Sequence, residues 1–178
     1  AITTWIKESL YFGLINPLNT FLKGLPWWYT SLIFTCVAFL ISGRGLAIAT
    51  AIGFLFIGAT DLWILGMTTL TTVTVSVLIC FIVGVPLGIL AAYNRTVDAL
   101  LKPVLDTMQT MPVFVYLVPV IMLFGGGQIP AVIATVIYAL PPLVRCTTLG
   151  IRELPEEINE VSSSFGASTT QTLTKVKI

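Results

Sequence analysis

Residues 68–93 read TTLTTVTVSVLICFIVGVPLGILAAY and contain no charged side chain. As an α-helix this stretch is about 39 Å long at 1.5 Å per residue, more than the roughly 30 Å of a bilayer's hydrocarbon core. The composition agrees: 56% of the chain is hydrophobic and 10% is charged, whereas soluble domains carry about 25% charged residues. The sequence therefore predicts an all-α fold, a polytopic transmembrane helical bundle.

The same criterion predicts four further spans, in the charge-poor windows 25–42, 46–60, 103–124 and 129–147. Residues 111–144 carry no charge, and this stretch is too long for a single span. Gly125, Gly126 and Gly127 interrupt it, followed by Pro130. We therefore expect a tight turn between the fourth and fifth spans.

The distribution of Lys and Arg predicts the orientation of the chain. Five spans place most of the cations on one side: Arg44, Arg95, Lys102, Arg145, Arg152, Lys175 and Lys177. Lys7 and Lys23 fall on the other side. The first side is then cytoplasmic, with the N-terminus outside and the C-terminal segment inside.

Residues 1–24 differ from the spans that follow. Ile2, Trp5, Ile6 and Leu10 share one helical face, as in an amphipathic helix on the outer membrane surface. A helix packed on the bundle would show the same spacing, so both interpretations stay open. No basic region leads into the first apolar stretch, and a secretory signal peptide is not expected.

Composition argues against several classes of function. The chain has no histidine, which removes imidazole-based catalysis and metal binding. Cys36, Cys80 and Cys146 lie in separate apolar stretches without a CxxC spacing, which is typical of small buried side chains. The net charge of +1 gives no support for nucleic-acid binding.

Prolines are frequent within the predicted spans, at positions 86, 112, 119, 141 and 142. Each removes a backbone donor and bends its helix. In lipid the freed carbonyl groups need partners, so such kinks face other helices or a cavity. This pattern favours a transport bundle over a membrane anchor.

Residues 150–178 form a charged segment after the last span, predicted as two short helices. Pro155 suits the first helical position, and Gly166 suits the point where the first helix stops. Ser168 and Gln171 then form a capping box for the second helix. The glutamates at the start of the segment are interpreted as a solvated helix face, because no His or Cys completes a ligand set.

The sequence around this segment resembles a known family. Residues 160–162 (EVS), Gly166 and residues 176–178 (VKI) are similar to the EAA loop of binding-protein-dependent ABC importer permeases, which reads E-A-A, three residues, G, nine residues, I-x-L-P. Val161 and Ser162 replace the two alanines, and the chain stops where the last proline is expected. Further spans follow this loop in the family, so we expect the sequence to be truncated there. Residues 105–112 (LDTMQTMP), 114–119 (FVYLVP) and 139–145 (ALPPLVR), with residues 164–168 (SFGAS), resemble the glycine betaine/proline subfamily, and this resemblance covers about residues 68–178.

The resemblance implies a division of labour among subunits. Two permease subunits, expected to be identical copies, form the pathway. Two cytoplasmic ABC ATPases bind ATP and Mg, and an extracytoplasmic binding protein delivers the solute. The membrane would be the inner membrane of a prokaryote. The EAA helix would dock in the ATPase, with Glu160, Phe165, Gly166 and Ala167 as the coupling residues. This chain lacks the ATP-binding sequence GxxxxGK[ST], so it is predicted to hold no cofactor and to be no enzyme.

A quaternary ammonium solute favours aromatic and polar side chains, and Gln109, Phe114 and Tyr116 are candidate lining residues, although ordinary packing explains the two aromatics equally well. We expect an N-terminal segment at 1–24, two peripheral helices in 25–67 and a permease core in 68–178. An ion-coupled secondary transporter or channel, and a membrane scaffold, are the competing classes. A secondary transporter or channel requires charged side chains within the membrane, and the middle of each predicted span has none.

Overall fold

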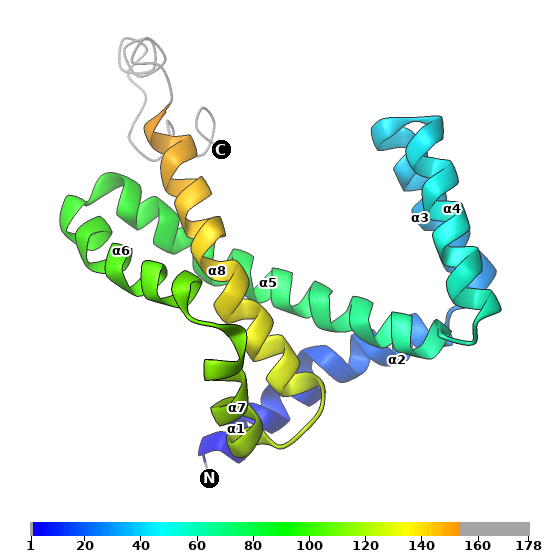
Figure 1. Ribbon diagram of the computed structural model, residues 1–178, viewed down its shortest axis with the longest axis horizontal. Helices are drawn as coiled ribbons and strands as arrows, with labels where there is room; N and C mark the ends of the chain where they lie inside the picture. Colours follow the sequence, from blue (N-terminus) through cyan, green and yellow to red (C-terminus); the bar gives the residue numbers. More distant parts are fainter. Residues whose placement is uncertain (1, 154–178) are drawn as a thin grey trace. The chain divides into compact units, whose positions relative to one another are not determined.

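The computed structural model describes residues 2–153, and this part of the chain is helical with short connections (Figure 1). Helix α1 (Ile2–Leu10), the π-helix η1 (Tyr11–Ile15) and α2 (Asn16–Gly24) form the N-terminal segment. They are followed by α3 (Trp27–Ser42), α4 (Arg44–Ala59), α5 (Trp63–Tyr93), α6 (Arg95–Thr110), α7 (Val113–Phe124) and α8 (Gln128–Arg152). The predicted all-α class is confirmed.

Among residues 2–153, two helices, α5 and α8, are each long and apolar enough to cross a membrane. The number rises to four if two bent pairs, α1–α2 with α3 and α6 with α7, each count as one span. Helix α4 is apolar but shorter. The third and fifth predicted spans therefore correspond to continuous helices, and both helices extend beyond the predicted bounds.

The fourth predicted span, 103–124, is not a continuous helix. Helix α6 begins earlier, at Arg95, and ends at Thr110, and α7 starts at Val113. The cause is local: Met111 precedes Pro112, and its backbone is extended at φ −71° and ψ 129°, because the proline ring disfavours a helical residue before it. Pro103 and Pro119 lie inside α6 and α7 without ending them.

The chain forms two compact units. The N-terminal unit contains residues 1–77 and 114–135, and the C-terminal unit contains residues 78–113 and 136–178, of which 136–153 are described. Both α5 and α8 run from the N-terminal unit into the C-terminal unit.

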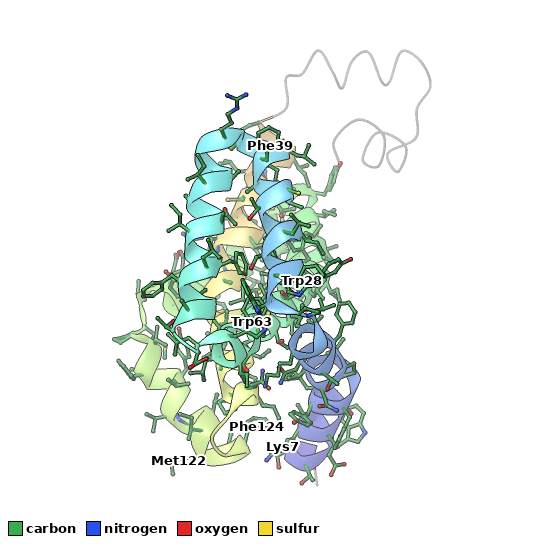
Figure 2. All side chains as sticks on the ribbon, turned by 90° about the vertical axis from the view of Figure 1, so that its right-hand side faces the viewer. Lys7, Trp28, Phe39, Trp63, Met122 and Phe124 are labelled. Carbon is green, nitrogen blue, oxygen red and sulfur yellow. The ribbon has the colours of Figure 1, made fainter. Side chains whose placement is uncertain are left out.

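In the N-terminal unit, α3 and α4 form an antiparallel hairpin turned at Gly43, which has a φ of 76°. Phe34 and Phe54 stack between the two helices with ring centroids 5.3 Å apart. Figure 2 shows Trp28 and Trp63 near one end of this hairpin and Phe39 near the other. On its outer surface Leu40 is 81% exposed, which suits contact with lipid and not with water.

The N-terminal segment bends by 102° where it meets α3, at Leu25–Pro26. Ile15 in η1 is fully buried, whereas Trp5 and Ile6 on the apolar face of α1 are exposed. The position of this segment, on the membrane surface or packed on the bundle, stays a prediction. The predicted turn between α7 and α8 is confirmed, with Gly125 and Gly127 at φ values of 80° and 128°.

Candidate functional site: the junction of α5, α6 and α8

Close packing of α5 against α8 defines the C-terminal unit. A Cβ atom on Gly88 would lie 2.6 Å from Thr147 Cβ and 2.9 Å from the Val144 carbonyl oxygen. One turn earlier, a Cβ on Gly84 would meet the Leu143 side chain at 2.9 Å. The spacing Gly84–Gly88 is the small-xxx-small pattern that lets membrane helices approach closely.

A hydrogen bond between the two helices reinforces this contact. The Thr148 hydroxyl lies 3.0 Å from the Gly88 carbonyl oxygen and 2.9 Å from the Val144 carbonyl oxygen of its own helix. Thr148 is 8% exposed, so its hydroxyl is satisfied within the protein, as a buried polar group requires.

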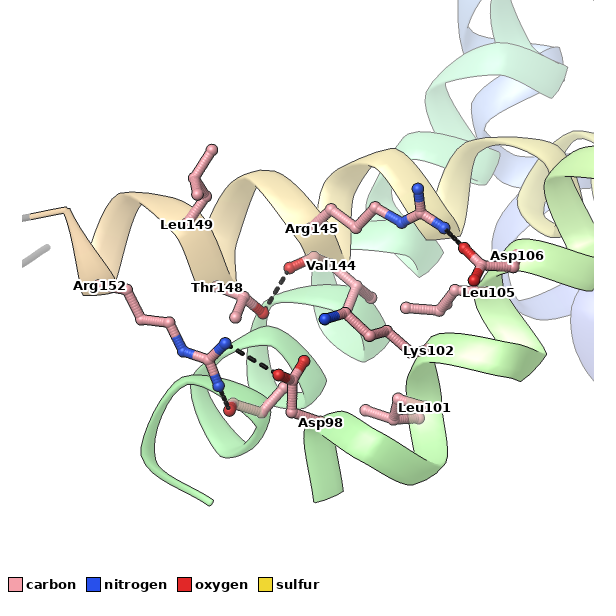
Figure 3. Close-up of a pocket in the computed structure, with 11 residues that line it drawn as sticks. Asp98, Leu101, Lys102, Leu105, Asp106, Val144, Arg145, Thr148, Leu149 and Arg152 are labelled. Atoms are coloured by element: carbon pink, nitrogen blue, oxygen red, sulfur yellow. Dashed lines mark hydrogen bonds and ion pairs between the residues drawn. The ribbon is translucent and has the colours of Figure 1, made fainter. Parts of the chain in front are cut away.

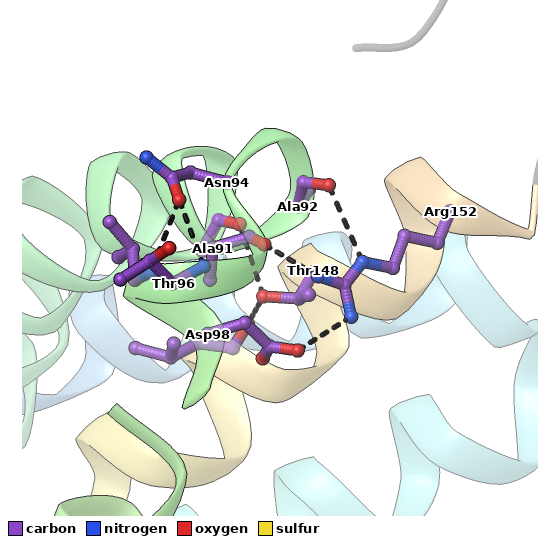
Figure 4. A network of polar contacts seen from close by, with 10 residues as sticks. Ala91, Ala92, Asn94, Thr96, Asp98, Thr148 and Arg152 are labelled. Carbon is purple, nitrogen blue, oxygen red and sulfur yellow. Dashed lines mark hydrogen bonds and ion pairs between the residues drawn. The ribbon is translucent and has the colours of Figure 1, made fainter. Parts of the chain in front are cut away.

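Arg152, the last residue of α8, holds the end of α5. Its Nη2 donates to the Ala91 carbonyl oxygen at 2.6 Å, and its Nε donates to the Ala92 carbonyl oxygen at 3.4 Å (Figure 4). The last four carbonyl groups of a helix lack partners within that helix and carry partial negative charge. A guanidinium group placed there satisfies two of them and is electrostatically favourable.

The same guanidinium reaches α6. Its Nη1 lies 2.9 Å from Asp98 Oδ2, and Asp98 is in the first turn of α6, where a carboxylate suits the helix dipole. Asn94 caps this helix: its Oδ1 accepts from the backbone N–H groups of Thr96, at 2.9 Å, and Val97, at 3.3 Å. One side chain of α8 thus ties together the end of α5 and the start of α6.

A second ion pair, Arg145 with Asp106, joins α8 to α6 two turns away. Together the two pairs border an open groove of about 370 Å³ between these helices and the end of α5 (Figure 3). Its apolar wall includes Leu101, Leu105 and Leu149, and Lys102 also lines it.

The opposite ends of α5 and α8 meet in the N-terminal unit through an amide. Gln128, the first residue of α8, accepts from Asn19 Nδ2 at 3.1 Å and donates to the Thr68 carbonyl oxygen at 3.3 Å. The Ser76 hydroxyl lies 3.4 Å from the Val132 carbonyl oxygen. Small and polar residues therefore mediate the α5–α8 contact within this unit too.

The predicted pathway residues have different environments. Gln109 is exposed near the end of α6, Phe114 is 74% exposed, and Tyr116 is half-buried. The Tyr116 hydroxyl oxygen is buried without a hydrogen-bond partner among residues 2–153. Gln109 belongs to the C-terminal unit and the two aromatics to the N-terminal unit, so a common lining formed by the three stays a prediction.

The predicted coupling residues Glu160, Phe165, Gly166 and Ala167 lie outside the described residues. The sequence-based interpretation missed the residues that anchor the helix preceding them, namely Arg152 and its partners. The spacing of the charges was the available signal. Asp98 and Asp106 are eight residues apart and Arg145 and Arg152 are seven apart, so each pair lies on one side of its helix. Within residues 2–153 no three His, Cys, Asp or Glu side chains cluster as metal ligands.

Residues 84–178, more than half of the chain, match the family described as binding-protein-dependent transport system inner membrane component. The chain belongs to this family. It begins to match within α5, just where Gly84 and Gly88 pack against α8, and the match includes the whole junction of α5, α6 and α8. The family assignment made from the EAA loop is confirmed, and the permease is a multi-pass protein of the inner membrane.

Similar proteins are named as permeases for methylated solutes. The glycine betaine/proline betaine transport system permease protein ProW of Escherichia coli (strain K12) is 43% identical over 93% of this chain and 47% of its own length. The glycine betaine permease OpuAB of Bacillus subtilis (strain 168) is 43% identical over 98% of this chain and 65% of its own. The glycine betaine/carnitine permease GbuB of Listeria monocytogenes is 41% identical over 97% and 63%. This permease sequence thus spans about half to two thirds of these relatives.

Proposed function

We propose that the chain is the membrane-spanning permease subunit of an ATP-driven importer for a compatible solute such as glycine betaine or proline. Support comes from the family, from the names of the relatives, and from the helix junction that directly precedes the EAA loop. ATP and Mg would bind to separate cytoplasmic ATPase subunits. A second copy of the permease, an extracytoplasmic binding protein and membrane lipid would complete the assembly. We further propose the domain division 1–24, 25–67 and 68–178.

The junction suggests how an ATPase stroke reaches the bundle. The EAA segment follows α8 within the chain, and the last residue of α8 is bonded to both α5 and α6. A push on that segment therefore acts on three helices together, since Arg152 ties them at one point. Rigid movement of such a group is one of the known ways in which a transporter changes between discrete packed states. In this role Glu160, Phe165, Gly166 and Ala167 contact the ATPase, and Arg152 distributes the motion.

The orientation belongs to the same proposal. With the N-terminus outside, the junction of α5, α6 and α8 lies on the cytoplasmic side, where Arg95, Lys102, Arg145 and Arg152 obey the positive-inside rule. A cysteine placed at Arg95 should then react with a membrane-impermeant reagent only in inside-out vesicles. A cysteine at Lys7 should react only in the opposite orientation.

The solute is proposed from chemistry and from the relatives. Glycine betaine carries a quaternary ammonium group, which aromatic faces bind without a fixed charge. Phe114 and Tyr116 offer such faces on α7, and Gln109 offers a polar group at the end of α6. These three residues remain our candidates for the pathway.

An ion-coupled secondary transporter is the alternative function. Such proteins place ionisable side chains within the membrane. Helix α5 has no charged residue, and in α8 the charged residues Arg145 and Arg152 lie in the last two turns. The distribution of charge therefore favours the ATP-driven importer.

The decisive test is solute uptake by the complete transporter in proteoliposomes. Uptake of labelled glycine betaine should require ATP and the binding protein. Gly166→Asp should leave the permease in the membrane but uncouple uptake from ATP hydrolysis, because an acidic side chain at the turn disrupts the docking element. Gly53→Asp, at an exposed position of α4 outside the junction, controls for a general effect of an added charge on insertion. Uptake that continues without ATP would refute the proposal.

A further inference from the structure

The groove between α6 and α8 carries an incomplete series of charges. Along α6 the residues Asp98, Lys102 and Asp106 follow one another at intervals of four and therefore share one face. The two aspartates are paired with Arg152 and Arg145 of α8. Lys102 lies between the two ion pairs (Figure 3) and has no carboxylate partner within residues 2–153.

The charges around Lys102 favour the binding of an anion. The side chains that line the groove include three cations and two carboxylates, and both carboxylates already accept from arginines. Between Arg145 and Arg152, the α8 residues that line the groove are Thr148 and Leu149, neither of which carries charge. A single negative group in the groove would balance the lining and would also find donors on Arg145 that have no acceptor within residues 2–153.

The groove lies at the depth of lipid headgroups. Helix α5, with 31 residues, is about 46 Å long, whereas the hydrocarbon core of a bilayer is about 30 Å thick. Its last turn, which contains Ala91 in the groove wall, therefore reaches the headgroup region. On α6, Leu100 and Val104 are 68% and 54% exposed, so this helix has an apolar face next to its charged one, as interfacial helices do.

We propose that this groove is a binding site for the phosphodiester headgroup of an anionic phospholipid, with Lys102 as its main cation. The glycerol and the first acyl carbons would lie against Leu101 and Leu149. Basic pockets between helices at a membrane surface bind anionic lipids in this manner. The inference needs the family assignment but neither the proposed solute nor the proposed coupling to an ATPase.

Binding of lipid by the purified complete permease complex tests the proposal without any measurement of transport. Native mass spectrometry would count bound phosphatidylglycerol and phosphatidylcholine over a titration series. Lys102→Gln should weaken phosphatidylglycerol binding about fivefold, which corresponds to about 1 kcal/mol per surface cation, and Lys102→Arg should retain it. Arg44→Gln is the matched control, because it removes an exposed cation on the same predicted side but outside the groove.

Three results would overturn the assignment. The first is equal weakening by Lys102→Gln and Arg44→Gln, which indicates a diffuse surface charge. The second is displacement of the bound lipid by millimolar inorganic phosphate, which indicates a site for a free anion. The third is unchanged lipid binding by Lys102→Gln together with loss of the co-purifying ATPase, which indicates a protein-binding groove.

Discussion

The guanidinium Nη2 of Arg152 lies 2.6 Å from the carbonyl oxygen of Ala91, so the last residue of α8 closes the last turn of α5. The same group also holds Asp98 of α6 at 2.9 Å. Three helices are therefore connected by one side chain at the point where the chain enters its EAA loop. This arrangement supports the proposal that a push on the segment after α8 acts on several helices together.

Replacement of Arg152 should affect coupling more than membrane insertion. Arg152→Gln removes the positive charge from the hydrogen bonds to Asp98 and to the carbonyl groups of Ala91 and Ala92. We expect the free energy of unfolding to fall by about 1–2 kcal/mol. This value is low in the range for charged hydrogen bonds, because the Arg152 side chain is 38% exposed. The number of solute molecules imported per ATP hydrolysed should fall severalfold. Arg95→Gln, which removes a nearby cation of α6, is the control. An unchanged ratio for Arg152→Gln would contradict the role given to this residue.

Gly88 should not tolerate even a methyl group. Gly88→Ala places a Cβ 2.6 Å from Thr147 Cβ and 2.9 Å from a backbone oxygen, and overpacking of this kind costs about 1–3 kcal/mol. Thermal unfolding of the detergent-solubilised permease should therefore shift to lower temperature. Gly53→Ala is the matched control, because its Cβ has no neighbour within 4 Å and alanine favours a helix. Equal effects of the two substitutions would mean that the close contact of α5 and α8 is absent in the membrane.

The cap at Asn94 should contribute modestly to stability. Asn94→Ala leaves the N–H groups of Thr96 and Val97 without their acceptor and should cost about 1 kcal/mol. Asn94→Asp should be tolerated, since a carboxylate also caps and suits the helix dipole. Thermal unfolding of the three proteins side by side is the measurement. Similar unfolding temperatures for the alanine variant and the unchanged permease would count against the cap.

The ion pair between Asp106 and Arg145 should matter less than the one at Arg152. Its side chains are 61% and 44% exposed, and exposed pairs are worth about 0.2–1 kcal/mol. Asp106→Asn should therefore change the unfolding temperature little, whereas Asp98→Asn should lower it more, because Asp98 is 22% exposed. The reverse order would show that the pair at Asp106 is the stronger connection.

Several features could be read from the sequence because they depend on local or summed properties. The absence of charge in residues 68–93 predicted a spanning helix, since an unpaired charge is costly in hydrocarbon. The glycines at 125–127 predicted the turn after α7, because glycine adopts positive φ without strain. The break at Met111–Pro112 was predicted only as a kink, because proline spacing alone does not distinguish a bent helix from two helices.

By itself, then, the sequence determined the helical class, the membrane environment and the family, because hydrophobicity and short motifs are carried by neighbouring residues. Only the tertiary structure decided that Gly84 and Gly88 face α8, that Arg152 closes α5, and that Lys102 lies between two satisfied ion pairs. These relationships join residues about 40–60 positions apart. They depend on how far each helix is rotated about its axis, and that rotation is set by the packing of one helix against another.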